Sequence, residues 1–125
     1  MVSNIIKNPV CYWELASHDA EKSMKFFNKV FDWNFQYDEI IGIYEILVKE
    51  ESDDFVGGGI FTLKQAKLPF LTIYIKVDDL AAKMKLIEEN GGLIVNKPTD
   101  LPSGSKICLF NEPSGVTFAM IQRKS

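Results

Sequence analysis

Histidine and cysteine, which supply many metal ligands, nucleophiles and redox groups, are scarce in this chain of 125 residues. It has one histidine, His18, and two cysteines, Cys11 and Cys108, and these do not form a CxxC motif. Both cysteines lie in apolar, strand-like segments, and we expect them to be buried thiols. The composition therefore excludes a metal or redox site of the CxxC type.

Long apolar runs and basic clusters are also missing. No stretch is long enough to span a membrane, and Met1–Lys7 lacks the apolar core of a signal peptide, so we expect a cytoplasmic protein without a membrane partner. The net charge is -3 and the charges are interspersed, which argues against nucleic acid as a partner. A hydrophobic share of 46% and a charged share of 25% are typical of a globular protein, here one domain over residues 1–125.

What the sequence does contain is an internal repeat with an offset of 60 residues. Tyr12–Asp19 and Thr72–Asp79 are both alternating segments that end in an aspartate, and the same offset pairs Met24 with Met84. In both halves the apolar period changes from 2 before the aspartate to about 3.6 after it. This change predicts a strand followed by a helix in each half.

The aspartates and the glycines mark where these elements should begin and end. Asp19 and Asp79 are predicted to cap the N-termini of the two helices, and Gly91 to end the second helix in the left-handed conformation. Leu80, Met84 and Ile87 should form the buried stripe of the second helix. Strand-like runs follow at roughly Trp33–Tyr37, Gly42–Lys49, Gly57–Leu63, Gly92–Val95, Ser105–Phe110 and Val116–Gln122, with an acidic exposed loop at Glu50–Asp54 and a turn at Asn111–Gly115.

Each half therefore has the element order βαβββ, and the predicted fold class is α+β. Module one covers about residues 8–63, a linker about 64–69, and module two about 70–123. We expect the modules to pair about a pseudo-two-fold axis into a curved mixed sheet around a central cavity. The strand residues predicted to pack under the helices are Trp13, Leu15, Ile73, Ile75, Phe118 and Met120.

The opposite face of these strands carries the candidate ligand-binding residues. An antiparallel sheet with one face in water would show the same alternation, and this is the alternative interpretation. Two large amphipathic side chains, Tyr12 and Tyr74, favour a cavity, and the repeat places Glu14 and Tyr74 at equivalent positions from which they should converge. The candidate residues are Tyr12, Glu14, Thr72, Tyr74, Lys76, Thr117 and Ala119.

Glu14 is the candidate for catalysis. A carboxylate partly buried beside Tyr12 and Tyr74 would have a raised pKa and could act as a general acid or base. Lys76 could instead pair with it, or Glu14 could be structural, hydrogen-bonded to a tyrosine or the backbone. His18, at the corner between strand and helix, is a surface residue in one interpretation and a base or ligand in the other.

Two glycine- and proline-containing segments have no catalytic motif. Gly57–Gly59 lacks the Lys-Ser/Thr of a phosphate-binding loop and opens a strand, so we interpret it as a bulge or a place where the cavity needs no side chain. The segment from Pro98 to Gly104 either borders the mouth of the cavity, simply connects two strands, or is disordered.

The residues resemble one superfamily over nearly the whole chain. Tyr12–Leu15, Asp19 and Phe26–Trp33 look like the opening module of the vicinal oxygen chelate superfamily, which includes glyoxalase I, extradiol dioxygenases, and the bleomycin- and fosfomycin-resistance proteins. Asn111–Phe118 is similar to the family's Asp-Pro-x-Gly-Asn turn, with Asn111-Glu112 where a single Asp is common. The resemblance is specific for the fold and weak for any one activity.

The resemblance implies a divalent metal held by four His, Glu or Gln side chains, one from the first and one from the last strand of each module. The corresponding residues here are Tyr12, Gly59, Thr72 and Ala119. None of them suits a hard or borderline divalent ion, which prefers carboxylate or imidazole ligands. We therefore expect no metal and no other cofactor.

Several functions stay open at this point, including whether the chain is an enzyme. The first is a metal-free, bleomycin-resistance-like protein that binds a small molecule. The second is a metal-dependent lyase, isomerase or dioxygenase of the same superfamily. The third is a metal-free enzyme that uses Glu14 as the base and Tyr12 or Tyr74 as the hydrogen-bond donor, and the fourth is an interaction module without a ligand. The resemblance also makes a homodimer plausible.

Overall fold

A computed structural model describes residues 7–48, 56–64 and 68–124. It has the predicted α+β class, and by its internal contacts the chain divides into two compact units. The first unit comprises residues 12–72, and the second comprises residues 1–11 together with 73–125. The predicted acidic loop, Glu50–Asp54, lies outside the described residues, as do Lys49 of one predicted strand and residues 65–67 of the predicted linker.

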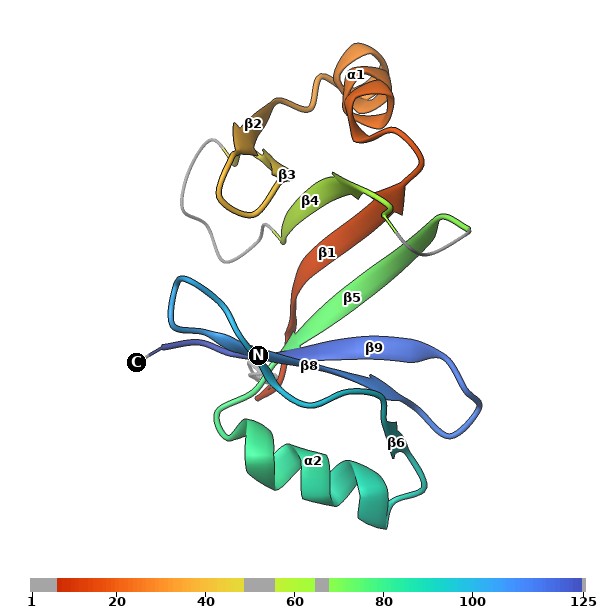
Figure 1. Ribbon diagram of the computed structural model, residues 1–125, viewed down its shortest axis with the longest axis vertical. Helices are drawn as coiled ribbons and strands as arrows, with labels where there is room; N and C mark the ends of the chain where they lie inside the picture. The colour runs from red at the N-terminus through yellow and green to blue at the C-terminus, as the bar shows by residue number, and fades with distance from the viewer. Residues whose placement is uncertain (1–6, 49–55, 65–67, 125) are drawn as a thin grey trace, which may run out of the picture. The chain divides into compact units, whose positions relative to one another are not determined.

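The first unit is built from one helix and a mixed sheet (Figure 1). The strand order is β2-β3-β4-β1, in which β1 and β4 run parallel and the other neighbours antiparallel. Val10 and Cys11 at the start of β1 belong to the second unit. The elements are β1 (Val10–Ser17), α1 (Ala20–Phe31), β2 (Phe35–Asp38), β3 (Ile43–Ile46) and β4 (Gly57–Thr62).

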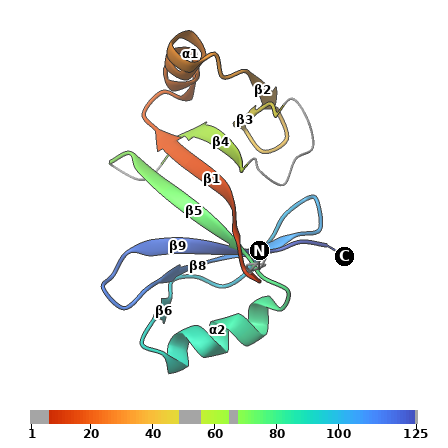
Figure 2. The ribbon, with the colours of Figure 1, turned by 180° about the vertical axis from the view of Figure 1, so that it is seen from behind.

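The second unit repeats this plan with the strand order β5-β9-β8-β6, in which β5 and β9 are parallel (Figure 2). Its elements are β5 (Phe70–Lys76), α2 (Leu80–Glu89), β6 (Leu93–Ile94), β7 (Thr99–Asp100), β8 (Lys106–Asn111) and β9 (Thr117–Gln122), except that the first three residues of β5, Phe70–Thr72, belong to the first unit. The sequence did not predict β7, which pairs with β8 through Thr99 with Ile107 and Asp100 with Lys106. Two residues are too few to show an alternating pattern, so this strand depends on its partner.

The helices begin where the two aspartates predicted. The Asp19 carboxylate accepts a hydrogen bond from the Lys22 backbone N–H at 3.2 Å, and Asp79 accepts one from the Ala82 N–H at 3.0 Å. Each bond satisfies one of the N–H groups that a helix start leaves without an intrahelical partner. Gly91 follows α2 with φ +91°, which confirms the predicted left-handed residue after that helix.

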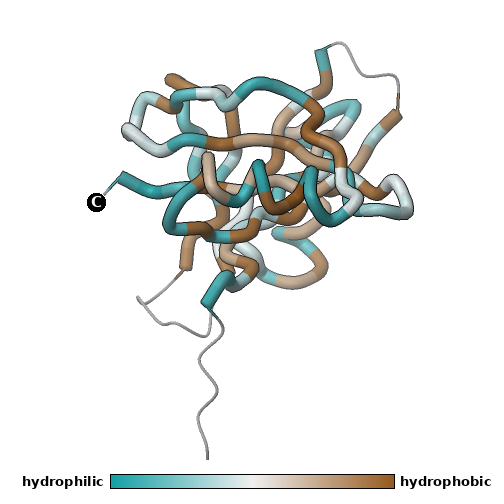
Figure 3. The backbone as a smooth tube through the Cα atoms, turned by 90° about the horizontal axis from the view of Figure 1, so that it is seen from below, coloured by the Kyte–Doolittle hydropathy of each residue, from teal (hydrophilic) through white to brown (hydrophobic). Residues whose placement is uncertain are grey.

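The core of each unit lies between its helix and its sheet. In the second unit, Leu80 and Val77 pack with Met120, Cys108 and Phe110, and Ile75, Met84, Ile87 and Phe118 pack against this cluster, as the alternation predicted. In Figure 3, α2 faces the viewer and alternates between hydrophilic and hydrophobic segments, as expected for a helix with one buried side. Cys108 is buried as predicted, whereas Cys11 is only half-buried.

In the first unit, aromatic side chains connect the helix to the sheet. The ring of Phe27 stacks on Trp33 with centroids 5.2 Å apart, and Trp33 lies 5.8 Å from Trp13 on β1. Two further apolar residues of α1, Val30 and Phe31, are each 56% exposed. The apolar side chains at helical spacing on α1 are therefore half-buried at Met24 and Phe27 and exposed at Val30 and Phe31.

Candidate functional site

One face of the first unit's sheet, opposite α1, gathers several side chains of the sequence prediction. Glu14 on β1 is in register with Gly59 on β4, and Gly59 is in register with Glu45 on β3. Residues in register share a face, and the strand alternation adds Tyr12 to it. We call this set, Tyr12, Glu14, Glu45 and Gly59, the open face of the first unit.

Side chains from neighbouring strands lie directly over Gly58 and Gly59 of β4, and this explains why these positions have no side chain. A Cβ atom on Gly58 would lie 1.9 Å from the ring of Trp13, and one on Gly59 would lie 2.5 Å from the Tyr12 hydroxyl oxygen and 2.6 Å from Ile43 Cγ2. The segment was predicted to be a bulge or a place without side chains. It forms a regular strand, and the missing side chains leave room for Trp13 on one face and Tyr12 on the other.

Tyr12 is held in its protonated form. Burial raises the pKa of its phenol strongly, and the nearby carboxylates of Glu45, Glu14 and Asp38 raise it further because they disfavour a second negative charge. Burial also raises the pKa of Glu45, with a smaller contribution from Asp38. At neutral pH the open face therefore presents a phenol that donates a hydrogen bond beside acidic groups.

Two residues of this acidic group, Glu45 and Asp38, were missed by the sequence analysis. The sequence gives a partial indication for Glu45, because this acidic residue interrupts the apolar run of the predicted strand Gly42–Lys49. Alternation alone shows that Glu45 shares a face with Ile43, and only the register with Gly59 shows which face this is. Asp38 also has a structural role, since its carboxylate accepts a hydrogen bond from the Ile40 N–H at 2.9 Å.

The corresponding face of the second unit carries the other predicted residues. Tyr74 on β5 is in register with Ala119 on β9, and the adjacent pair, Ile75 with Met120, points to the α2 core. Tyr74 and Ala119 therefore lie on the face opposite α2, and both are buried. Thr72 lies two residues before Tyr74 on the same strand and is also buried, although the division into units assigns it to the first unit.

Three other residues singled out from the sequence are exposed. Lys76 ends β5, and its backbone N–H donates to the Pro9 carbonyl. Thr117 begins β9, and its hydroxyl donates to the Asn111 side-chain carbonyl at 2.5 Å. His18 lies in the turn between β1 and α1. The structure thus brings Tyr12 and Glu14 to one face and Tyr74 and Ala119 to another, while the convergence of Glu14 with Tyr74 stays a prediction.

The chemistry of the side chains at the family's metal positions does not fit a divalent ion. Gly59 and Ala119 offer no donor atom, and Tyr12 offers a neutral phenol, since its pKa is raised. Within the described parts of the chain, no three His, Cys, Asp or Glu side chains are grouped so that they could hold a metal ion.

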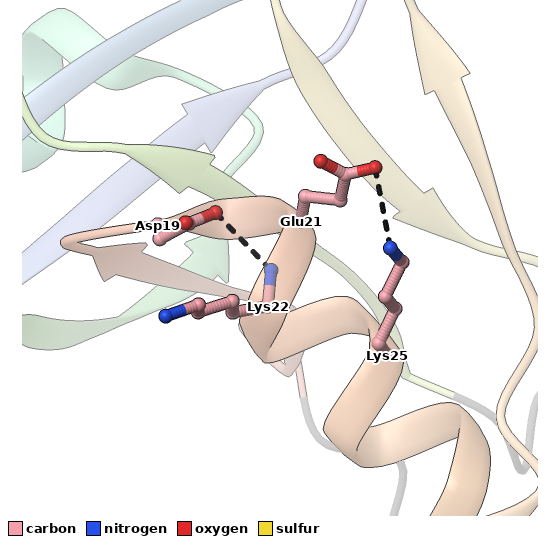
Figure 4. Close-up of polar contacts among 4 residues, drawn as sticks. All are labelled: Asp19, Glu21, Lys22 and Lys25. Atoms are coloured by element: carbon pink, nitrogen blue, oxygen red, sulfur yellow. Dashed lines mark hydrogen bonds and ion pairs between the residues drawn. The ribbon is translucent and has the colours of Figure 1, made fainter.

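A separate pocket of about 690 Å³ lies within the first unit, beside the N-terminus of α1. Its wall combines two aromatic pairs with charged side chains. Tyr37 and Tyr44 lie with ring centroids 4.8 Å apart, and Phe61 and Phe70 lie 6.4 Å apart. The charged groups are Asp19, Glu21 and Lys64. Figure 4 shows Asp19 capping the helix and Glu21 paired with Lys25. The carboxylate oxygen of Glu21 lies 3.6 Å from the Lys25 ammonium nitrogen. The sequence analysis did not predict this pocket.

Neither helix in the described residues has the length and apolarity needed to cross a membrane. A comparison with curated protein sequences gives no match. A family model of the Glyoxalase/Bleomycin resistance protein/Dioxygenase superfamily, in contrast, matches residues 10–120.

Solved structures with the same fold match the chain over almost its whole length. A hypothetical protein from Bacillus halodurans C-125 is 15% identical with a TM-score of 0.70, covering 96% of this chain and 97% of the other. Methylmalonyl-CoA epimerase from Mycobacterium tuberculosis is 14% identical with a TM-score of 0.68, covering 100% and 94%. The Streptomyces coelicolor methylmalonyl-CoA epimerase, in a complex with 2-nitronate-propionyl-CoA, is 15% identical with a TM-score of 0.63, covering 96% and 97%. At these identities the similarity establishes the fold.

Proposed function

The chain belongs to the Glyoxalase/Bleomycin resistance protein/Dioxygenase superfamily, and we propose that it is a small-molecule-binding member that works without the superfamily's metal ion. The observation that carries this proposal is the position of Tyr12. Its hydroxyl oxygen occupies the space that a side chain at position 59 would need, 2.5 Å from the Cβ site. The two positions that the resemblance assigns to metal ligands in this unit would thus hold a neutral phenol and a glycine, neither of which suits a divalent ion.

The open face of the first unit supports a ligand that is partly polar and partly apolar. Tyr12 is a hydrogen-bond donor at neutral pH, and Glu14 and Glu45 supply carboxyl groups next to it. Ile43 and the glycine backbone of β4 provide the apolar part of the same surface. A molecule with hydroxyl, amide or amine groups on an apolar frame fits this combination, and Thr72, Tyr74, Lys76, Thr117 and Ala119 are proposed as its further contacts.

Two of the three solved structures described above are methylmalonyl-CoA epimerases, one in a complex with an acyl-CoA analogue. This suggests acyl-CoA thioesters as the first compounds to test. The proposal itself does not require this class, because fold similarity at about 15% identity leaves the ligand open.

The proposal is tested by metal analysis and ligand binding on the same preparation. We expect protein purified without chelator to contain far less than one equivalent of Ni, Zn, Fe, Mn or Co, and EDTA to leave its melting temperature unchanged. A thermal-shift screen of acyl-CoA thioesters, metabolites and antibiotics should then find a stabilising compound without added metal. A stoichiometric metal, or binding that needs one, would overturn the proposal. If no compound stabilises the protein, an interaction module is the better interpretation.

A second candidate function, a metal-free enzyme that transfers a proton, is favoured by the raised pKa of Glu45 next to a protonated Tyr12. A carboxyl group with a raised pKa is suited to general acid or base catalysis, and the phenol could donate to a substrate oxygen. Glu14→Gln and Glu45→Gln should then abolish turnover while binding persists. If both variants turn over the identified ligand at the wild-type rate, this candidate fails.

We also propose that the protein is a cytoplasmic homodimer. Light scattering coupled to size-exclusion chromatography tests the assembly, and a mass near 14.2 kDa at micromolar concentration would contradict it.

A further inference from the structure

The pocket beside the N-terminus of α1 has a chemistry of its own. All the residues that line it belong to the first unit, so its geometry does not depend on the second. Its volume of about 690 Å³ lies within the range of small-molecule sites. It is lined by side chains other than those of the open face defined above.

Four aromatic rings dominate the wall of this pocket. Tyr37 and Tyr44 form one pair, and Phe61 and Phe70 form the other, close to perpendicular at 76°. Tyr37 is 49% exposed and Phe70 is 45% exposed, so ring surface remains in contact with solvent. Aromatic faces carry a negative quadrupole and attract cations and flat apolar groups.

At the helix terminus beside this pocket, two of the backbone N–H groups that could bind an anion already donate to acceptors within the protein. The Ala20 N–H donates to the Thr62 hydroxyl at 3.0 Å, and the Lys22 N–H donates to the Asp19 carboxylate (Figure 4). The Asp19 carboxylate brings a negative charge to the position that a bound anion would take. Glu21 adds a second carboxylate, although Lys25 lies 3.6 Å away from it.

The preference for a positive ligand rests on the Asp19 carboxylate, which lies in the pocket wall. Glu21 is paired with Lys25, and Lys64 on the other side adds a positive charge that opposes this preference. We propose that this pocket is a second binding site, independent of the proposed function, for an organic cation with a flat aromatic body. The rings hold the flat body, and Asp19 attracts the positive charge through its carboxylate, whose oxygens accept more than the one hydrogen bond from Lys22.

Three bicyclic probes of similar size and different charge test the selectivity: N-methylquinolinium, quinoline and naphthalene-2-carboxylate. Titrations at low ionic strength, followed by the backbone amide signals of the protein, give the affinities. We expect the cation to bind about tenfold more tightly than the neutral probe, and the carboxylate not to bind. The amides of Gly42, Thr62 and Leu63 at the pocket should shift, and that of Gly59 should not.

The repeat supplies a matched control for the charge. Asp19→Asn removes the carboxylate but keeps a good N-cap, and Asp79→Asn makes the same change at the α2 cap, which does not line this pocket. We expect Asp19→Asn to weaken binding of N-methylquinolinium about threefold or more and Asp79→Asn to leave it unchanged. Lys64→Gln should strengthen it, and Tyr37→Leu with Phe70→Leu should weaken it about tenfold.

Three results would overturn the proposal. The first is no saturable binding of N-methylquinolinium at millimolar concentration, and the second is equal binding of all three probes. The third is an equal effect of Asp19→Asn and Asp79→Asn. The melting temperature of each variant shows whether it is folded, and the opposite signs expected for Asp19→Asn and Lys64→Gln cannot both result from a loss of stability. None of these results bears on the open face, where the proposed function is tested by metal content and by compounds of other classes.

Discussion

Gly59 on β4 and Tyr12 on β1 show how single residues decide the chemistry of the open face. In a superfamily whose metal ligands come from strands of this kind, Gly59 offers no ligand, and the Tyr12 hydroxyl oxygen lies 2.5 Å from where its Cβ would be. The two residues are therefore coupled: Tyr12 can lie across the strand because Gly59 has no side chain.

This coupling can be measured as stability. We expect Gly59→Ala to lower the free energy of unfolding by about 1–3 kcal/mol, because the added methyl group contacts Tyr12 and Ile43. Tyr12→Phe removes the closest atom and should recover part of this loss when combined with Gly59→Ala. Urea denaturation of the two single variants and the double variant gives the interaction energy. Additive effects of the two substitutions would show that the hydroxyl does not occupy this space.

The N-termini of the two helices are the features that could be predicted most accurately from neighbouring residues in the sequence. Asp19 and Asp79 are separated by the repeat offset, and both accept a hydrogen bond from the backbone N–H three residues later. The alternating segments before them became β1 and β5, and the periodic segments after them became α1 and α2. A cap works through groups a few residues away, and such short-range interactions are visible in sequence.

At the scale of the element, the N-caps of α1 and α2 should contribute equally to the free energy of unfolding. We expect Asp19→Ala and Asp79→Ala each to lower the free energy of unfolding by about 1 kcal/mol, and the corresponding asparagine variants to lose much less. Thermal and urea denaturation of the four variants gives these values. A loss that is the same for alanine and asparagine would indicate that charge, and not the hydrogen bond, is responsible.

At the scale of the molecule, the boundaries of the compact units differ from those of the sequence repeat, and one difference lies at the N-terminus. Residues up to Cys11 belong with the unit that contains residues 73–125. Hydrogen bonds of the described residues contribute to this connection: the Lys76 N–H donates to the Pro9 carbonyl at 2.8 Å, and the Asn8 side-chain amide donates to the Lys76 carbonyl at 3.1 Å. The N-terminal segment therefore stabilises the end of β5, in the second half of the chain.

Deletion of residues 1–9 tests this connection. We expect the Lys76 amide to exchange its hydrogen about tenfold faster in the shortened chain, because its acceptor is removed. The neighbouring Val77 amide, which donates to the Ile121 carbonyl, is the internal control and should change little. Hydrogen exchange followed by NMR resolves the two amides. Equal acceleration at both would mean that the deletion loosens the whole unit.

The amino-acid sequence was sufficient for the α+β class, the duplicated βαβββ plan, the caps and the identity of the superfamily, because each depends on periodicity or on contacts between near neighbours. The assignment of Tyr12 and Gly59 to the family's metal positions came from the resemblance and the repeat offset, and it stays a prediction. The sequence could not show β7, the acidic neighbours Glu45 and Asp38, or the aromatic pocket. These depend on which strands pair and in which register, and register is decided by contacts between residues far apart in the chain, so only the folded structure determines them.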